Sequence, residues 1–251
     1  MSRRPPAATR VFRFDGRVAL VHERGSGPAT PVVLVHGIGV ARLYFEPLAD
    51  VLAASGRVLI VELPGFGRAP KLRPSDPPTI EEHARLLAAL LRDAGGGPYR
   101  IVGHSMGTQI VADLAARDQD LVADLALLGP VTDPAAPDAV RQGLRLALDT
   151  LGESAGANAA VFTDYLRTGP RWYLRTLPFM LGYDLLGALP RIQAPGLVIR
   201  GARDPIAPHD WTAEVAAHLP RSRLVEVPGA HHVVQFTNPE AVAAALAEGV
   251  R

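Results

Sequence analysis

The sequence predicts an α/β fold built on a mostly parallel sheet. Six short apolar runs are continuous rather than alternating, which is typical of strands buried on both faces. They are residues 32–35, 58–61, 100–102, 125–128, 196–199 and 224–227. Segments with helical character lie between them, at about 42–55, 79–93, 106–117, 209–218 and 238–248. Because parallel strands need crossover connections, this alternation predicts right-handed βαβ units.

Two regions depart from the alternation. Residues 9–23 form two alternating runs around Asp15-Gly16, a pair that suits the two-residue turn of a β-hairpin. Between Pro130 and Pro190 no strand pattern occurs, and Ala, Leu and Arg recur at helical spacing. Prolines 134, 137, 170 and 178 act there as expected breakers. A plain loop of that length is uncommon, so we expect a helical insertion that packs over one end of the sheet.

Composition excludes several classes of protein. The chain has 251 residues and is 48% hydrophobic, enough for one large α/β domain or two small ones. Its 26 basic and 25 acidic residues nearly cancel, so no nucleic-acid partner is expected. The absence of cysteine excludes disulfides, thiolate catalysis and cysteine-ligated metals. Without an apolar run of about 18 residues or an apolar signal region near the start, we expect no membrane span and a cytoplasmic location.

The strongest local motif is Gly-His-Ser-Met-Gly at residues 103–107. It matches G-x-S-x-G, with an apolar strand pattern before it and an amphipathic stretch after it. On such a strand-to-helix turn, the Ser105 Oγ projects above the sheet edge. Gly103 and Gly107 relieve crowding where strand and helix approach, and the helix N-terminus favours a developing oxyanion. Ser105 is therefore the candidate nucleophile.

A serine hydroxyl needs a base, and the base needs an orienting acid. In the chain order Ser, Asp, His that this fold type uses, Asp204 follows the strand pattern at 196–200, and Asp133 is a rival after 125–128. The base is one of two adjacent histidines, His231 or His232, which follow the last strand pattern. The remaining histidines are better explained by packing or surface positions, although His36 borders the predicted site.

An oxyanion hole requires two backbone N–H groups that face the oxygen which becomes charged. One should come from Met106, the residue after the nucleophile. The other should come from the loop after an early strand, and His36-Gly37-Ile38-Gly39 follows residues 32–35. Ile38 is the candidate donor through its N–H group, so its side-chain identity matters less.

Taken together and in this order, these motifs resemble the α/β-hydrolase superfamily over nearly the whole chain. Beyond 36–39 and 103–107, the matching segments are Leu-Pro-Gly-Phe-Gly at 63–67, Gly-Ala-Arg-Asp at 201–204, Pro-Gly-Ala-His-His at 228–232 and Asn-Pro-Glu at 238–240. The resemblance implies a mostly parallel eight-stranded sheet flanked by helices, with a helical cap inserted after the sixth strand. The cap would span 131–190, and the core 1–130 and 191–251.

The resemblance also favours His232 as the base, with Asp204 as its acid. Two residues depart from the pattern: Glu62 stands where aspartate is usual, and His231 where glycine is common. Ser105 excludes the relatives with an aspartate nucleophile, such as the dehalogenases and epoxide hydrolases of this fold.

We expect a serine hydrolase that cleaves a small carboxylic ester, lactone or thioester through an acyl-enzyme. A carbon–carbon bond hydrolase of the meta-cleavage type, a cofactor-free perhydrolase and a ligand-binding protein that keeps the triad remain open as alternatives. No cofactor, metal or nucleic acid is expected, and the chain would act as a monomer or homodimer. Side chains expected to line an apolar acyl pocket are His36, Phe162, Tyr165, Trp172, Tyr173, Phe179, Met180 and Val233.

Overall fold

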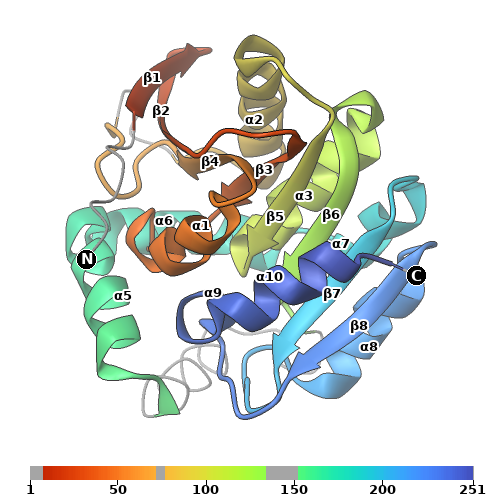
Figure 1. The fold of residues 1–251 in the computed structure, drawn as a ribbon. Helices are drawn as coiled ribbons and strands as arrows, with labels where there is room; N and C mark the ends of the chain where they lie inside the picture. The colour runs from red at the N-terminus through yellow and green to blue at the C-terminus, as the bar shows by residue number, and fades with distance from the viewer. Residues whose placement is uncertain (1–7, 72–76, 134–151, 251) are drawn as a thin grey trace.

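An eight-stranded sheet organises the molecule, with the order β1-β2-β4-β3-β5-β6-β7-β8 (Figure 1). The computed structural model describes residues 8–71, 77–133 and 152–250. Pairing is antiparallel for β1 with β2 and for β2 with β4, and parallel for every other pair, so the predicted mostly parallel sheet is confirmed. The strands are β1 (Ala8–Phe14), β2 (Arg17–Arg24), β3 (Ala29–Val35), β4 (Gly56–Glu62), β5 (Tyr99–His104), β6 (Val122–Leu128), β7 (Gly196–Gly201) and β8 (Ser222–Val227).

The N-terminal hairpin turns where it was predicted. Asp15 and Gly16 connect β1 to β2 and both have positive φ, of 47° and 70°. Such a pair of left-handed residues matches the twist of the strands that it joins.

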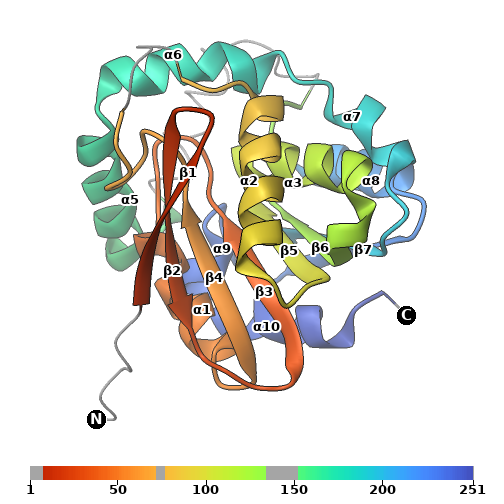
Figure 2. The same ribbon diagram turned by 90° about the horizontal axis from the view of Figure 1, so that it is seen from above.

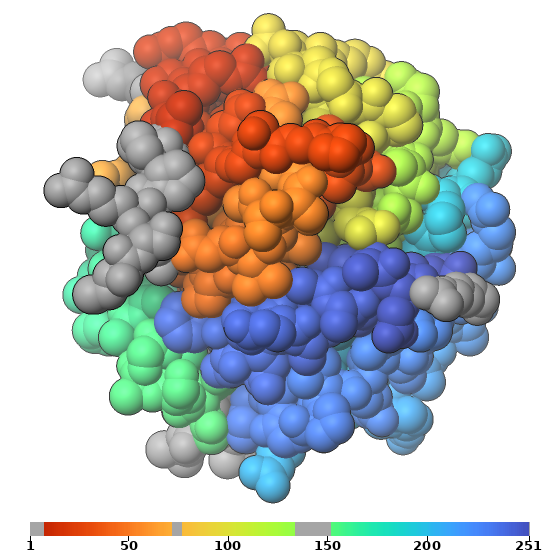
Figure 3. All heavy atoms as spheres, viewed as in Figure 1, coloured from red at the N-terminus to blue at the C-terminus, as the bar shows by residue number. Residues whose placement is uncertain are grey.

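Helices cover both faces of the sheet (Figures 1 and 2). One face carries α1 (Glu46–Leu52), α9 (Val234–Thr237) and α10 (Pro239–Glu248), and the other carries α2 (Ile80–Ala94), α3 (Met106–Arg117) and α8 (His209–His218). Three short 3₁₀ helices, η1 (Leu43–Phe45), η2 (Gln119–Leu121) and η3 (Leu189–Arg191), lie in connections. In the space-filling view, α1 and α10 adjoin across the covered face (Figure 3). The five predicted helices are therefore present, whereas α9 was not anticipated.

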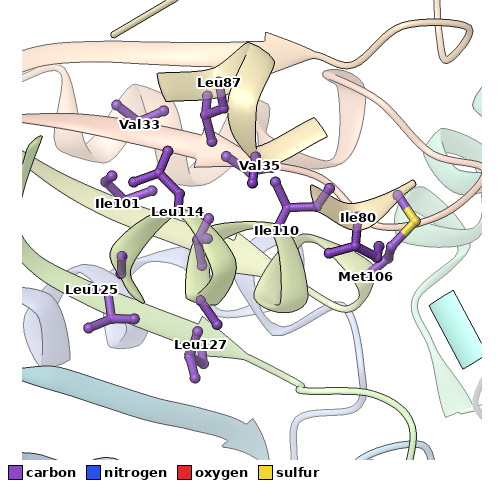
Figure 4. Packing of buried hydrophobic residues seen from close by; sticks show 14 of the residues in the cluster. Val33, Val35, Ile80, Leu87, Ile101, Met106, Ile110, Leu114, Leu125 and Leu127 are labelled. Carbon is purple, nitrogen blue, oxygen red and sulfur yellow. The ribbon is translucent and has the colours of Figure 1, made fainter. Parts of the chain in front are cut away.

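Two hydrophobic cores follow from the alternation of side chains along each strand. Val33, Val35 and Ile101 face α2 and α3, whereas Leu34 and Val102 face α1 and α10. In the first of these cores, Leu87 of α2 and Leu114 of α3 pack among the strand side chains (Figure 4). Burial on both sides explains why the central strands are continuous apolar runs.

The segment between β6 and β7 is helical, as expected. Its helices α5 (Ala155–Thr168), α6 (Pro170–Leu181) and α7 (Leu185–Ala188) precede η3, and no strand occurs in the described residues 152–195. Helices α5 and α6 lie beyond one end of the sheet rather than on either face (Figure 2). We call residues 152–191 the cap segment. Residues 134–151, with the expected breakers Pro134 and Pro137, lie outside the described residues.

Proline at position 178 does not end a helix. Pro170 is the first residue of α6, where the missing N–H costs nothing, but α6 continues through Pro178 to Leu181. The breaker prediction for Pro178 is therefore wrong. The division of the chain into a core (1–130, 191–251) and a cap (131–190) stays a prediction.

Among the helices within residues 8–71, 77–133 and 152–250, none has the length and apolar character needed to cross a membrane.

Candidate active site

The carboxyl ends of the parallel strands meet at one edge, and the candidate residues follow them. In register, Gly103 of β5 pairs with Val35 of β3 and with Leu127 of β6, and Val198 of β7 pairs with Leu127 and with Leu224 of β8. The loops after these strands therefore start side by side. This is the edge where open α/β sheets place their sites.

Ser105 occupies a strained turn between β5 and α3. Its φ of 57° and ψ of −124° are unusual for a residue with a side chain. The turn is held by the Ser105 N–H, which donates to the Leu128 carbonyl at 2.9 Å, and by Thr108, whose N–H donates to the Ser105 carbonyl. Such strain persists only where the surroundings impose it, and it is concentrated at functional sites.

Two glycines make this turn possible. A Cβ on Gly103 would lie 2.3 Å from the Gly107 carbonyl oxygen, and a Cβ on Gly107 would lie 2.3 Å from the Val35 carbonyl oxygen. Neither distance can be accommodated without moving backbone. The glycines of the G-x-S-x-G motif therefore allow α3 to start directly against β3 and β5.

The acid and base candidates form a buried pair. Nδ1 of His232 lies 2.7 Å from Oδ2 of Asp204, and the two side chains are 6% and 0% exposed. The other carboxylate oxygen of Asp204 accepts from the N–H groups of Ile206 and Ala207 at 2.8 and 3.0 Å. Burial alone would raise the pKa of Asp204, but the His232 ring and these two N–H groups outweigh it and hold the pKa below its usual value. Asp204 is therefore kept as a carboxylate that faces the base.

The pair fits because neighbouring backbone leaves room for it. A Cβ on Gly129, directly after β6, would lie 3.0 Å from Nδ1 of His232 and 3.3 Å from Oδ2 of Asp204. A Cβ on Gly201, the last residue of β7, would lie 2.2 Å from the His231 carbonyl oxygen. His231 itself points elsewhere, since its ring lies against Gly152 at the start of the cap segment.

Arg200 supports the acid loop and was missed by the sequence analysis. It is 4% exposed on β7. Its guanidinium donates to the carbonyls of Ala207 at 2.8 Å and Asp204 at 3.2 Å and pairs with Glu226. A guanidinium is rarely buried without such partners. An arginine inside an otherwise apolar strand pattern is the signal that could have identified it.

The loop of residues 36–41, which follows β3, passes directly over Ser105. A Cβ on Gly37 would lie 2.8 Å from the Ser105 Cβ and 3.2 Å from its Oγ. Among the described residues, no hydrogen bond to the N–H group of Ile38 or of Met106 is found. Both residues are buried, at 6% and 0% exposure. The two N–H groups that were predicted to form an oxyanion hole therefore have no hydrogen-bond partner among the described residues.

A chain of hydrogen bonds joins the 36–41 loop, the turn at Ser105 and the loop that carries His232. The Gly37 N–H donates to the Tyr44 hydroxyl at 2.8 Å, and that hydroxyl lies 3.1 Å from Nδ1 of His104. Nε2 of His104 lies 3.0 Å from the His232 carbonyl oxygen, which can only accept. His104 therefore donates from Nε2 and accepts the Tyr44 proton at Nδ1. Burial and the nearby His232 lower the pKa of His104, in agreement with this neutral tautomer.

His36 is part of the framework rather than of the site surface. Its ring is fully buried, with Nδ1 2.8 Å from the Gly37 carbonyl oxygen and Nε2 accepting from the Leu63 N–H at 3.0 Å. Burial lowers the pKa of His36 to about 4. Both ring nitrogens are engaged within the protein, and the contact between the His36 side chain and substrate stays a prediction.

Glu62, the unusual residue before Leu63, is buried at the end of β4. Its carboxylate accepts from the Arg68 N–H at 2.8 Å and lies 3.3 Å from Nε2 of His22. Burial would raise its pKa, but these partners keep the pKa of Glu62 below its usual value. The carboxylate thus fixes the 63–68 loop, which also contacts the cap segment.

Three of the cap side chains predicted to line a pocket pack on loops of the core, and a fourth does not. Tyr165 and Tyr173 pack on the 36–41 loop at Gly39, and their rings meet edge to face with centroids 5.7 Å apart. Trp172 packs on Gly65 of the 63–68 loop. Phe162 is different: it is 63% exposed, so most of its ring faces solvent and its place in the pocket stays a prediction. About 200° of helical turn separates it from Asp164, a buried residue of the same helix.

The other three predicted side chains are at least half-buried. Met180 and Val233 are 4% and 7% exposed, and Phe179 is intermediate. The Met180 carbonyl accepts from Nε2 of Gln109 at 2.9 Å, which ties α6 to the helix that follows Ser105. The Val233 N–H donates to Glu153 at 2.7 Å, which ties the base loop to the start of the cap segment.

A strained serine at a strand-to-helix turn, beside a buried carboxylate–imidazole pair on this sheet, defines the class of α/β hydrolases. The model of the alpha/beta hydrolase family matches residues 32–245, and the chain belongs to that family. It is therefore an enzyme, a hydrolase with the α/β-hydrolase fold.

The sequence is similar to a pimeloyl-[acyl-carrier protein] methyl ester esterase of Chromobacterium violaceum, with 32% identity over 91% of this chain and 96% of the relative. A relative from Neisseria meningitidis serogroup C carries the same name and is 30% identical over 88% of this chain and 94% of its own. The fold is similar to that of the enol-lactonase from Burkholderia xenovorans LB400, with a TM-score of 0.82, 23% identity and coverage of 95% and 98% of the two chains.

Proposed function

We propose that the chain hydrolyses a small carboxylic ester by acyl transfer to Ser105, with His232 as general base and Asp204 as the acid that orients it. The observation that carries this proposal is the buried contact of 2.7 Å between Asp204 and His232. The His232 carbonyl oxygen lies 3.0 Å from Nε2 of His104, the residue directly before Ser105 with its positive φ. The Asp204 carboxylate has no solvent exposure, and burying a charge is costly unless it is paired and hydrogen-bonded. In a triad its use is to hold the imidazole in one tautomer and to stabilise the imidazolium.

In the first half of the reaction, Oγ of Ser105 attacks the carbonyl carbon of the ester while Nε2 of His232 accepts the hydroxyl proton. The tetrahedral intermediate carries its negative charge on the former carbonyl oxygen. The N–H groups of Ile38 and Met106, free of other partners among the described residues, donate to this oxyanion. The carbon–oxygen bond to the alcohol then breaks, and the imidazolium returns its proton to the leaving alkoxide.

In the second half, water attacks the acyl-serine, and His232 takes one of its protons. A second oxyanion forms in the same place and collapses. The bond to Oγ breaks, Ser105 regains a proton from the imidazolium, and the carboxylic acid leaves. Asp204 remains a carboxylate throughout, since the surroundings that lower its pKa disfavour protonation.

We infer that the acyl group binds between the core loops and the cap segment. Support comes from Tyr165 and Tyr173, whose rings pack on the 36–41 loop that contacts Ser105, and from Trp172, whose ring packs on the 63–68 loop. Met180, Phe179 and Val233 stay candidates for the same wall. Pockets of this kind are mostly apolar, with few polar groups that fix orientation.

The test is turnover of p-nitrophenyl esters of increasing acyl length, together with methyl esters, since the names of the relatives describe methyl ester substrates. Wild type is compared with Ser105→Ala and with a matched control, Ser55→Ala, whose hydroxyl only donates to the Leu52 carbonyl at the surface. We expect a loss of roughly 10⁴- to 10⁶-fold in kcat for Ser105→Ala. The control should retain wild-type rates.

Equal activity in wild type and Ser105→Ala would overturn the role of Ser105. Absence of wild-type turnover on every ester would overturn ester hydrolysis as the reaction. A best acyl length would size the acyl site, whereas equal rates for acetyl and long acyl esters would contradict an apolar pocket.

A further inference from the structure

The 36–41 loop is anchored at its two ends by different parts of the chain. At the start, the core supplies both contacts: the Gly37 N–H donates to Tyr44, and the Leu63 N–H donates to the His36 ring. At the far end, both contacts come from α5. The Ala41 N–H donates to Oδ2 of Asp164 at 3.0 Å, and the Thr168 hydroxyl donates to the Gly39 carbonyl at 2.9 Å. Ile38 lies between the two pairs of anchors.

Packing reinforces the polar contacts. Gly39 has φ of 80°, and a Cβ there would lie 2.3 Å from the Tyr165 ring and 2.9 Å from the Tyr173 ring. The loop is therefore pressed against α5 and α6 with no space to spare. In the space-filling view the α5 atoms adjoin those of the α1 region, which follows the loop (Figure 3).

Asp164 is an unusual residue for a plain packing contact. It is 1% exposed, and burial raises the pKa of its carboxyl although the Ala41 N–H and Arg167 act in the opposite direction. A buried carboxylate that receives a backbone N–H forms a charge-assisted hydrogen bond, which is short and directional. Arg167 lies 3.2 Å from the other oxygen, and Lys71 donates to the carbonyls of Arg167 and Thr168, which fixes the last turn of α5.

We propose that Asp164 and Thr168 are positioning residues that hold the 36–41 loop, so that the Ile38 N–H points at the reacting oxygen only when α5 is seated. This inference rests on the proposed function, because it assigns α5 to the oxyanion hole of that reaction. An oxyanion donor acts on the transition state, so its displacement lowers kcat rather than raising KM. A displacement of about 1 Å can cost on the order of 100-fold in rate.

The test uses pairs of variants that keep or remove one hydrogen-bonding atom in the full-length chain. Thr168→Val removes the donor to Gly39 and Thr168→Ser keeps it; Asp164→Leu removes the acceptor for Ala41 and Asp164→Asn keeps it. Thr176→Val is the matched control, because Thr176 is also 1% exposed in the cap segment but donates to Trp172 of its own helix at 2.9 Å.

With p-nitrophenyl acetate we expect kcat to fall roughly 10- to 100-fold in Thr168→Val and Asp164→Leu, with KM changed less than about 3-fold. Thr168→Ser, Asp164→Asn and Thr176→Val should stay within about 3-fold of wild type. Equal kcat in Thr168→Val and Thr176→Val, or a loss confined to KM, would overturn the proposal.

Amide hydrogen exchange provides a readout that does not need an active enzyme. Peptides over residues 37–43 should exchange faster in Thr168→Val than in Thr176→Val, while β5 stays equally protected. Unchanged exchange in the loop would overturn the anchoring role even if activity fell. If wild type shows no esterase activity that depends on Ser105, the proposed function fails, and the exchange result still decides whether α5 anchors the loop.

Discussion

The core and the cap segment hold their site residues in different ways. In the core, the loops after β5, β6 and β7 continue the hydrogen bonding of the sheet: Ser105 donates to Leu128, Gly129 to Ile199, and Ala202 to Val227. The cap segment reaches the core through separate side-chain contacts, such as Thr168 to Gly39 and Gln109 to Met180.

Because of this difference, substitutions in the two regions should affect stability and reaction rate in different ways. A change that displaces backbone in the core disturbs a ladder in which every bond supports the next, so fold and chemistry should fail together. A change in the cap segment removes one contact and leaves the sheet intact. Four sets of substitutions test this difference between the two regions, beginning with the largest expected effect.

The largest effect is expected for Asp204→Asn. The amide can still accept from Ile206 and Ala207, so the loop should keep its shape, but it no longer stabilises the charged imidazole. We expect kcat to fall roughly 10⁴-fold with little change in melting temperature. Asp113→Asn is the control, because this buried carboxylate pairs with Arg117 away from the strand ends and should leave kcat within about 3-fold. Comparable losses in the two variants would contradict the role of Asp204.

A pair of glycine substitutions compares the two regions directly. Gly107→Ala puts a methyl group 2.3 Å from the Val35 carbonyl, so it should destabilise the fold by about 1–3 kcal/mol or more. Gly156→Ala in α5 meets nothing closer than 3.5 Å and should be neutral or stabilising by up to about 1 kcal/mol. Urea unfolding measures both, and similar stability in the two variants would refute the contrast.

The loss of folding stability at acid pH should come from a residue of the core. His83 is fully buried in α2, neither ring nitrogen has a hydrogen-bond partner among the described residues, and burial lowers its pKa to about 3. Below an unfolded pKa of about 6.5, only the unfolded state binds the proton, so stability is lost as pH falls toward the folded pKa. His83 should account for about 2 kcal/mol of the loss between pH 7 and pH 5.

His83→Leu should remove that part of the slope and also raise stability at pH 7, because it replaces a buried polar ring that lacks partners. Urea unfolding at pH 7 and pH 5 measures both effects. An unchanged pH slope in His83→Leu would show that the ring is not the group responsible.

The smallest effect is expected at the surface of the cap segment. Phe162→Ser should leave kcat and KM within about 2-fold for every acyl length, because the side chain is 63% exposed. Trp172→Ala provides the comparison, since this ring is 8% exposed and packs on Gly65. A large rise in KM for Phe162→Ser with long acyl esters would restore the pocket role that the sequence suggested for Phe162.

The same contrast explains which features could be predicted from sequence. Ser105 stands in a local pattern whose glycines are required by contacts of 2.3 Å, and buried strands appear as apolar runs. Asp204 and His232 follow such runs, so topology predicts that they lie at the same edge of the sheet as Ser105. The choice of these two over Asp133 and His231 came from the resemblance to the family. The predicted eight-stranded, mostly parallel sheet is confirmed by the sheet order and the α/β-hydrolase fold by the family match, whereas the cap stays a prediction.

The contacts of the cap segment could not be predicted in this way. Its aromatic residues show how many large side chains exist but not which face of a helix they occupy, so Phe162 was grouped with Tyr165. Contacts such as Asp164 to Ala41 join residues far apart in sequence that no local pattern relates. The burial of His36 could not be predicted either, because its ring contacts Leu63, a residue of the loop that follows the next strand.

The hairpin at the start of the described residues forms one edge of the sheet. Strand β1 pairs with β2 along its whole length, so the free edge is β1 itself, whose residues are almost all exposed. An open edge with Val11 and Phe14 on it could template a strand from another molecule. Arg10 and Arg13 alternate with these apolar side chains, and Arg10 is drawn to Asp93 of α2. Charged side chains on an edge strand oppose pairing with a strand of another molecule, so Arg10 and Arg13 counteract the exposure of Val11 and Phe14.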